Sequence, residues 1–156
     1  MSKRQPIIQI NSSPELTVEF NETDEDPPLA GLISDAIISA ARGEGRRYGR
    51  ISVIIAGDEQ LQRLNSDYLN DDTPTDVLAF DLADVADALV EGDIFISLPR
   101  AAQQAAERNQ TTSEEIVRLA VHGFLHLCGW DHDDDAELQA MVDRGEIYVQ
   151  STVREA

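Results

Sequence analysis

The sequence predicts one compact α/β (α+β) domain, residues 1–156, in which a mixed sheet of four to five strands packs with about five helices. Short runs rich in Ile and Val alternate along the chain with segments whose apolar residues recur at helical spacing. One run, RISVIIA (50–56), is apolar enough to be buried on both faces, which is typical of a strand covered on both sides. No repeat and no long linker divides the chain, and 156 residues suffice for one hydrophobic core.

Before this central strand, the sequence predicts two short strands and a helix. PIIQI (6–10) and LTVEF (16–20) are strand-like runs separated by an NSSP turn. A helix begins at Pro27 and Pro28, where a missing N–H costs little, and the glycines at 43 and 45 end it. Its inward face is predicted to carry Leu29, Leu32, Ile33, Ala36, Ile37 and Ala40.

After the central strand, a helix and two further strands are expected. Asp58 can cap this helix. Its inward stripe would be Leu61, Leu64 and Tyr68. NDDTPTD (70–76) is a predicted loop. DVLAF (76–80) and GDIFIS (92–97) are predicted strands, and the aspartate-rich segment between them is predicted to be a solvated excursion.

The last third of the chain predicts three helices. The alanine-rich segment PRAAQQAAERN (99–109) favours the first. Thr111 and Glu114 form a T-x-x-E capping box that opens the second, which continues through VHGFLHLC and stops at Gly129. The third begins at about Asp134. Its apolar residues are Leu138, Met141, Val142, Tyr148 and Val149.

Composition limits the compartment and the partners. The net charge of −18 works against attracting polyanions or anionic lipids by bulk charge. Cys128 is the one cysteine, which fits a reducing compartment, and no apolar run suits a signal peptide or membrane span. We therefore expect a cytoplasmic protein that makes no membrane contact. Arg42, Arg46, Arg47 and Arg50 form a basic cluster that is either a solubilising loop or a set of phosphate contacts.

All three histidines lie in VHGFLHLCGWDHDDD (121–135), in the pattern H-x-x-x-H-x-x-G-x-x-H. His122 and His126 are four residues apart and share one face of the predicted helix, so they can bind one ion. Gly129 lets the chain turn, so that His132 arrives as a third ligand. Three neutral imidazoles leave the fourth tetrahedral position open, which is typical of a catalytic site. The pattern predicts one Zn²⁺ per chain, although nickel, cobalt or copper suit the same ligands.

Gly123 stands where zinc proteases with this spacing carry a catalytic glutamate. A zinc ion on three histidines lowers the pKa of a bound water to about 7, so the glycine removes a proton acceptor rather than the means of activating water. Cys128 lies away from the histidine face in helical projection, and we expect it to be a small packed residue rather than a ligand.

The candidate catalytic carboxylates are Asp76, Asp93 and Asp131. Asp131 directly precedes His132 and is better suited to orienting ligands or bonding to backbone than to acid–base chemistry. Asp76 and Asp93 are common residue types for a turn and a strand entry, respectively, and one of them could support the metal helix. The acidic run 133–135 is expected to cap and solvate the last helix.

Three stretches resemble one known family. HGFLHLCGWDH resembles the H-G-x-L-H-L-x-G-x-D-H signature of the YbeY family, LNSDYLNDDTPTDVLAF its helix end and P-T-D-V-L-S-F strand, and EGDIFIS its L-G-D-I-x-I-S strand. The resemblance covers roughly residues 50–150, and the preceding part fits only in outline. It implies a compact α/β fold around a mixed sheet with a metzincin-like metal helix. It also implies zinc bound by His122, His126 and His132.

The resemblance further implies a single-strand-specific, zinc-dependent endoribonuclease that acts in 3′-end maturation of 16S small-subunit ribosomal RNA and in ribosome quality control. Single-stranded ribosomal RNA and small-subunit ribosomal proteins would be its partners. Two alternatives remain. One is a ribosome assembly factor with a mainly structural metal. The other is a metal hydrolase of peptides or small molecules, which Gly123 disfavours.

The chain departs from the family pattern at several positions. Leu69 replaces an arginine that is a natural candidate for contacting an RNA phosphate, and no basic residue remains between Arg63 and Arg100. Smaller departures are Ala79, Asp81 and Glu91. The Leu69 substitution predicts weaker nuclease activity, with Arg42 to Arg50 as the best remaining phosphate contact.

Overall fold

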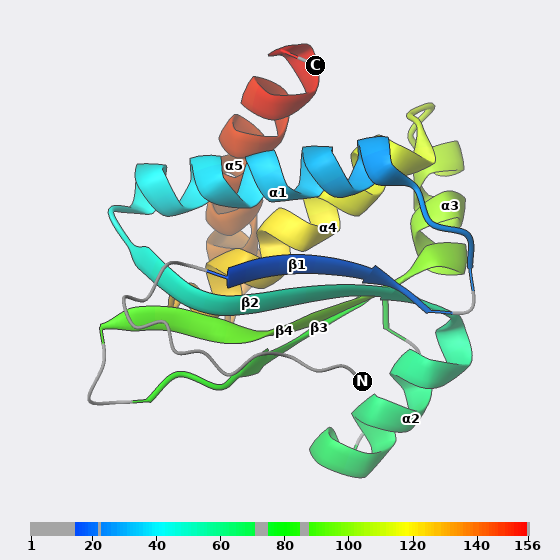
Figure 1. The fold of residues 1–156 in the computed structure, drawn as a ribbon, viewed down its shortest axis with the longest axis horizontal. Helices are drawn as coiled ribbons and strands as arrows, with labels where there is room; N and C mark the ends of the chain where they lie inside the picture. The colour runs from blue at the N-terminus through cyan, green and yellow to red at the C-terminus, as the bar shows by residue number, and fades with distance from the viewer. Residues whose placement is uncertain (1–14, 22, 71–74, 85–87, 156) are drawn as a thin grey trace.

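A computed structural model describes residues 15–21, 23–70, 75–84 and 88–155. In this part of the chain, four strands form one mixed sheet in the order β1-β2-β4-β3, and five helices surround it (Figure 1). β1 and β4 run parallel to β2, and β3 pairs antiparallel with β4. The elements are β1 (Glu15–Phe20), α1 (Pro27–Glu44), β2 (Arg47–Ala56), α2 (Asp58–Leu69), β3 (Val77–Asp81), β4 (Leu89–Ser97), α3 (Leu98–Glu107), α4 (Thr112–Leu127) and α5 (Asp135–Glu155).

This architecture confirms the predicted α/β class with a mixed sheet. The predicted strand 6–10 lies outside the described residues. Two observed strands start earlier than the sequence predicts, β2 at Arg47 and β4 at Leu89, because these two residues pair with each other beyond a register irregularity in β2. None of the helices in the described ranges is both long and apolar enough to cross a membrane.

The two faces of the sheet are covered unequally. Helices α1, α4 and α5 share the larger core with one face, to which β4 contributes Ile94 and Ile96. Helix α2 covers the other face through Leu61, which packs in a smaller cluster with Ile54 and Leu78. In Figure 1, α1 and α4 lie above the strands and α2 below them. The histidines belong to the side with the larger core, because α4 carries two of them.

The predicted helix ends are largely confirmed. Asp26 caps the proline start of α1, Gly45 ends it with a φ of 65°, Thr111 caps α4 and Asp134 caps α5. The Thr111 hydroxyl accepts from the Glu114 N–H at 3.1 Å. The Glu114 carboxylate binds Arg118 instead of closing the capping box.

Two predictions for α2 are wrong. Gly57, not Asp58, is the N-cap of this helix. The Asp58 carboxylate accepts from the Ser97 hydroxyl at 3.1 Å and from Arg100 Nε at 2.9 Å, so it joins α2 to the start of α3. Tyr68 is 70% exposed rather than inward, and its ring only touches the edge of Phe80. Tyr68 lies in the last turn of α2, whereas Leu61 lies in the first turn and is the buried apolar residue that packs the helix against the sheet.

Candidate metal centre

The three histidines meet at the C-terminal end of α4. His122 and His126 lie one turn apart on the helix, and their rings contact edge to face with centroids 4.7 Å apart. His132 comes from the segment between α4 and α5, after Gly129 turns the chain with a φ of 108°. Its ring centroid lies 5.7 Å from that of His126. One nitrogen from each ring lies within 4.8 Å of the others, so the predicted trio can converge on one ion.

The surroundings of His122 and His126 favour the neutral form that binds metals. Burial lowers the pKa of His122 to about 4, and burial also lowers the pKa of His126. Both rings are therefore uncharged at neutral pH, with a lone pair free to coordinate. Three neutral nitrogens with an open fourth position are the donor set of a catalytic zinc site. The residues present fit a zinc ion, as the sequence predicts.

A backbone carbonyl orients His126. Its Nδ1 lies 3.0 Å from the carbonyl oxygen of Trp130, an acceptor, so Nδ1 carries the proton and Nε2 is left to bind a metal. The Trp130 indole N–H in turn donates to Glu44 Oε1 at 2.9 Å. Glu44, at the end of α1, thereby fixes the segment that contains both this carbonyl and His132.

Glu44 is the centre of a network that sequence reasoning missed. Its other carboxylate oxygen accepts from Arg144 Nε at 2.7 Å and from the Tyr148 hydroxyl at 2.6 Å, both on α5. Burial alone would raise the pKa of Glu44, but the hydrogen bonds from Tyr148, Trp130 and Arg144 together hold it below its usual value. Arg46 adds a second anchor, since its Nη1 donates to the Cys128 carbonyl at 2.7 Å. These partners lie far apart in sequence, so no local pattern could reveal them.

Gly123 has a packing reason. A Cβ built at this position would lie 2.7 Å from Ile94 Cγ2, because α4 packs directly on β4 there. Ile94 is fully buried and β-branched, so it has little freedom to move. The protease-type glutamate is therefore excluded by the close approach of helix and sheet, and the chemistry must use other groups.

The three candidate aspartates occupy different places. Asp76 lies beside His122, where its negative charge acts to raise the pKa of that histidine and its Oδ2 accepts from Gln104 Nε2 at 3.0 Å. Asp131 accepts the backbone N–H of His132 at 2.8 Å, which is the local role expected for it.

Asp93 lies on the other side of the sheet, so its prediction as a support or base for the metal is wrong. Side chains alternate along β4, and Asp93 shares a face with Phe95, which packs toward α2. Its neighbour Ile94 faces α4 instead. Burial raises the pKa of Asp93, but the strand separates it from the histidines.

A pocket of about 290 Å³ opens from His122 between α3, α4 and α5. Its polar lining consists of Asp76, Gln104, Arg108, Glu115, Arg118 and Glu146. Its apolar wall includes Leu138 and Val142 of α5, which are 36% and 40% exposed. The pocket therefore continues the metal centre along α4 and offers a mixed surface to a bound molecule.

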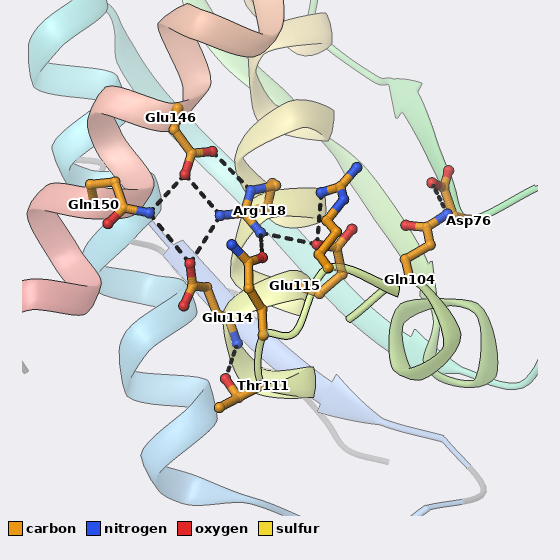
Figure 2. Close-up of polar contacts among 10 residues, drawn as sticks. Asp76, Gln104, Thr111, Glu114, Glu115, Arg118, Glu146 and Gln150 are labelled. Carbon is orange, nitrogen blue, oxygen red and sulfur yellow. Dashed lines mark hydrogen bonds and ion pairs between the residues drawn. The ribbon is translucent and has the colours of Figure 1, made fainter. Parts of the chain in front are cut away.

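One end of this pocket is closed by a network around Arg118 (Figure 2). The Arg118 guanidinium donates to Glu114, Glu115 and Glu146 at 2.8–3.0 Å. These bonds raise the pKa of Arg118 further above its usual value. Glu115 is 1% exposed, so this arginine neutralises a carboxylate inside the core.

The predicted arginine cluster divides into separate roles. Arg42 lies in the last turn of α1, and Arg46 is committed to the Cys128 carbonyl. Arg50 lies 3.8 Å from Glu15 on an exposed strand face. Leu69 is 55% exposed at the end of α2.

Cys128 is not a metal ligand, as the sequence predicts. Burial raises the pKa of its thiol to about 11, so the thiol remains protonated. Its sulfur is not among the atoms that converge with the three histidines.

Comparisons with known proteins find matches along most of the chain. A family model described as Endoribonuclease YbeY matches residues 17–152. The chain is 39% identical over 132 residues to an Endoribonuclease YbeY of Carboxydothermus hydrogenoformans, covering 85% of this chain and 92% of the relative. It is 37% identical to an Endoribonuclease YbeY of Bacillus cytotoxicus, with 76% and 86% covered. The solution structure of TM1509 from Thermotoga maritima aligns with a TM-score of 0.62 at 25% identity, over 90% of both chains.

Proposed function

The chain belongs to the YbeY family of endoribonucleases, hydrolases that act on RNA phosphodiester bonds, and on that premise we propose that it is a zinc-dependent enzyme specific for single-stranded RNA. The 3′ end of small-subunit ribosomal RNA is its proposed substrate. Its proposed roles are maturation of that end and ribosome quality control in the cytoplasm. The observation that carries the proposal is the convergence of one ring nitrogen from each of three histidines beside the open pocket that His122 lines.

His122, His126 and His132 would hold one zinc ion, which when bound supplies positive charge to a phosphate oxygen and makes a coordinated water more acidic. The Trp130 carbonyl keeps the proton of His126 on Nδ1 and its Nε2 free. Of the candidate aspartates, Asp76 is the group we assign to accept a proton from the attacking nucleophile. Among the described residues, only Gln104 donates to its side chain, at Oδ2, which leaves Oδ1 for that role.

The acidic surface bears on how the RNA arrives. A net charge of −18 opposes RNA binding by bulk attraction, and binding through a few arginines weakens steeply with salt. The same charge suits contact with basic ribosomal proteins. We therefore propose that a protein of the small ribosomal subunit presents the RNA to the site.

Cleavage of a single-stranded fragment from the 3′ end of small-subunit ribosomal RNA tests this function. The expected result is cutting of the single strand but not of a matched duplex, and faster cutting when small ribosomal subunits accompany the fragment. Equal and salt-insensitive cutting of naked RNA would contradict delivery by a partner. Failure to cut under any of these conditions would contradict the nuclease.

Leu69 favours a second candidate function. Without the family arginine at this position, the chain could act mainly as a ribosome assembly factor whose metal joins the end of α4 to the following segment. The two candidates differ in one result. Zinc-loaded protein that binds small subunits without cutting RNA would support the assembly role over the nuclease.

A further inference from the structure

Two arginines line the pocket beside His122, and neither belongs to the basic cluster seen in the sequence. They are Arg108, which directly follows α3, and Arg118 on α4. Leu69 leaves the end of α2 without a cation. Arg108 and Arg118 are therefore the two cations of the pocket. Their contacts with other side chains decide which one can bind a substrate.

Arg118 is committed to the protein. Its side chain is 14% exposed, and its nitrogens donate to the three carboxylates of its network and to Gln110 Oε1 at 2.8 Å. Removing these bonds would leave the buried negative charge of Glu115 with Arg108 as its one remaining cationic partner among the described residues. An incoming phosphate would have to compete with all of these acceptors, so Arg118 is a structural residue.

The Arg108 guanidinium is held by one carboxylate and is otherwise exposed to solvent. Its side chain is 52% exposed, and its Nη1 donates to Glu115 Oε1 at 3.0 Å. Among the described residues, this carboxylate is the one hydrogen-bonding partner of the Arg108 side chain, and Glu146 interacts with it only through its charge. Glu115 is itself fixed by Arg118. Arg108 is thus oriented by a rigid buried anchor, with its remaining N–H groups available to a ligand.

The charge of the pocket makes this arrangement sensitive to the metal. Two arginines face three carboxylates, Asp76, Glu115 and Glu146, so the lining alone is slightly negative. A divalent ion on the histidines reverses that balance. An anion would therefore bind between the metal centre and Arg108 far better in the metal-loaded protein than in the metal-free one.

We propose that Arg108 binds a phosphate of the single-stranded nucleic acid in this pocket and supplies the cation that Leu69 does not. This inference rests on the proposed function, because it takes the pocket to be part of the substrate path. Arginine suits the role, since its planar fork can donate two hydrogen bonds to one phosphate. The ligand class is a phosphodiester adjacent to the one that is cut.

Equilibrium binding of a fluorescent single-stranded oligodeoxynucleotide to the zinc-loaded protein tests the proposal, with the strand checked for integrity afterwards. Arg108→Ala leaves Glu115 paired with Arg118, so the fold is expected to persist. Loss of a charge-assisted hydrogen bond should weaken binding about 10-fold or more, and the salt slope should fall by about 0.7, the share of one phosphate contact. Removing the zinc should shrink the difference between wild type and variant.

Arg63→Ala is the matched control, because it removes the same charge from α2 on the opposite face of the sheet. It should leave affinity and salt slope nearly unchanged. If Arg108→Ala binds as Arg63→Ala does, or if the wild type does not bind the strand, the proposal is wrong. RNA cleavage by the wild type, measured in parallel, decides the nuclease function separately: binding that depends on Arg108 without cleavage would overturn the proposed function alone.

Discussion

Helix α4 carries two polar clusters on one face, and they are built on opposite principles. Arg118 lies one turn before His122 and two turns before His126. Around Arg118, charged groups are paired on every side with carboxylates at 2.8–3.0 Å. Around His122 and His126, burial favours the uncharged rings instead, and one nitrogen of each histidine, His132 included, lies within 4.8 Å of the others.

The pairing of charge around Arg118 is typical of a structural cluster, whereas uncharged rings with free nitrogens are typical of a metal-binding site. A buried charge needs full pairing, because an unpaired one destabilises the fold by several kcal/mol. A neutral imidazole can stay buried with a lone pair free at much smaller cost, and that lone pair is what a metal ion binds. The fully paired cluster stabilises the helix, and the one with free lone pairs is where chemistry can occur. Each of the following changes tests one half of this contrast.

The largest effect on stability should come from Arg118→Leu. It leaves Glu115 almost fully buried with only Arg108 as a partner, and breaking a buried pair costs about 3–5 kcal/mol. Urea unfolding of the metal-free protein would measure the loss. The double variant Glu115→Leu/Arg118→Leu should recover much of it. A single variant as stable as wild type would mean that the network is not structural.

Trp130→Phe should weaken the histidine cluster without unfolding the protein. It removes the indole N–H that ties the segment after α4 to Glu44, whose carboxylate keeps Arg144 and Tyr148 as partners. Loss of such support around a metal ligand typically lowers metal affinity about 10-fold. Competition with a chromophoric chelator would give the zinc affinity. Tyr148→Phe removes a different donor to Glu44 and should change zinc affinity less; equal effects would contradict the assigned role of Trp130.

Gly123→Ala tests the close packing between the histidines. Overpacking against Ile94 costs about 1–3 kcal/mol, and the better helix propensity of alanine offsets about 1 kcal/mol. A net loss on the order of 1 kcal/mol is expected from thermal or urea unfolding. Gly31→Ala in α1, where a Cβ would meet nothing within 4 Å, should instead stabilise. If both variants stabilise, α4 does not approach β4 as closely as described.

The smallest effect concerns acid stability. The hydrogen bonds from Arg118 lower the pKa of Glu146 below its usual value of 4.5. Its contribution to stability is therefore complete above about pH 4.5 and is lost as the pH falls through the lowered value. Glu146→Gln should reduce the fall in unfolding free energy below that pH and leave the profile near neutrality unchanged in shape. An unchanged acid limb would show that Glu146 does not contribute to acid stability through its charge.

The sequence predicted what depends on local spacing. Helical periodicity places His122 and His126 on one face, and Gly129 marks the turn that brings His132 to them; the structure has the same arrangement. Capping residues such as Thr111 were predictable for the same reason, because their partners lie three residues away.

Long-range contacts could not be predicted in this way. Glu44 meets Trp130 across 86 positions of the chain, and no pattern near either residue indicates the pairing. The position of Asp93 depends on which face of β4 turns toward α4, and the sequence alone does not fix this. The same holds for Arg108, whose exposure beside His122 results from the packing of α3 on α4.

We infer that the open histidine cluster, not the paired one, makes this protein a nuclease. Zinc content by elemental analysis, measured together with cleavage of a single-stranded ribosomal RNA fragment, tests this inference on wild type, His126→Ala and Cys128→Ala. We predict about one zinc per chain and cleavage for wild type and Cys128→Ala, with both lost in His126→Ala. Cleavage that survives in His126→Ala, or zinc-loaded wild type that never cuts RNA, would contradict the claim.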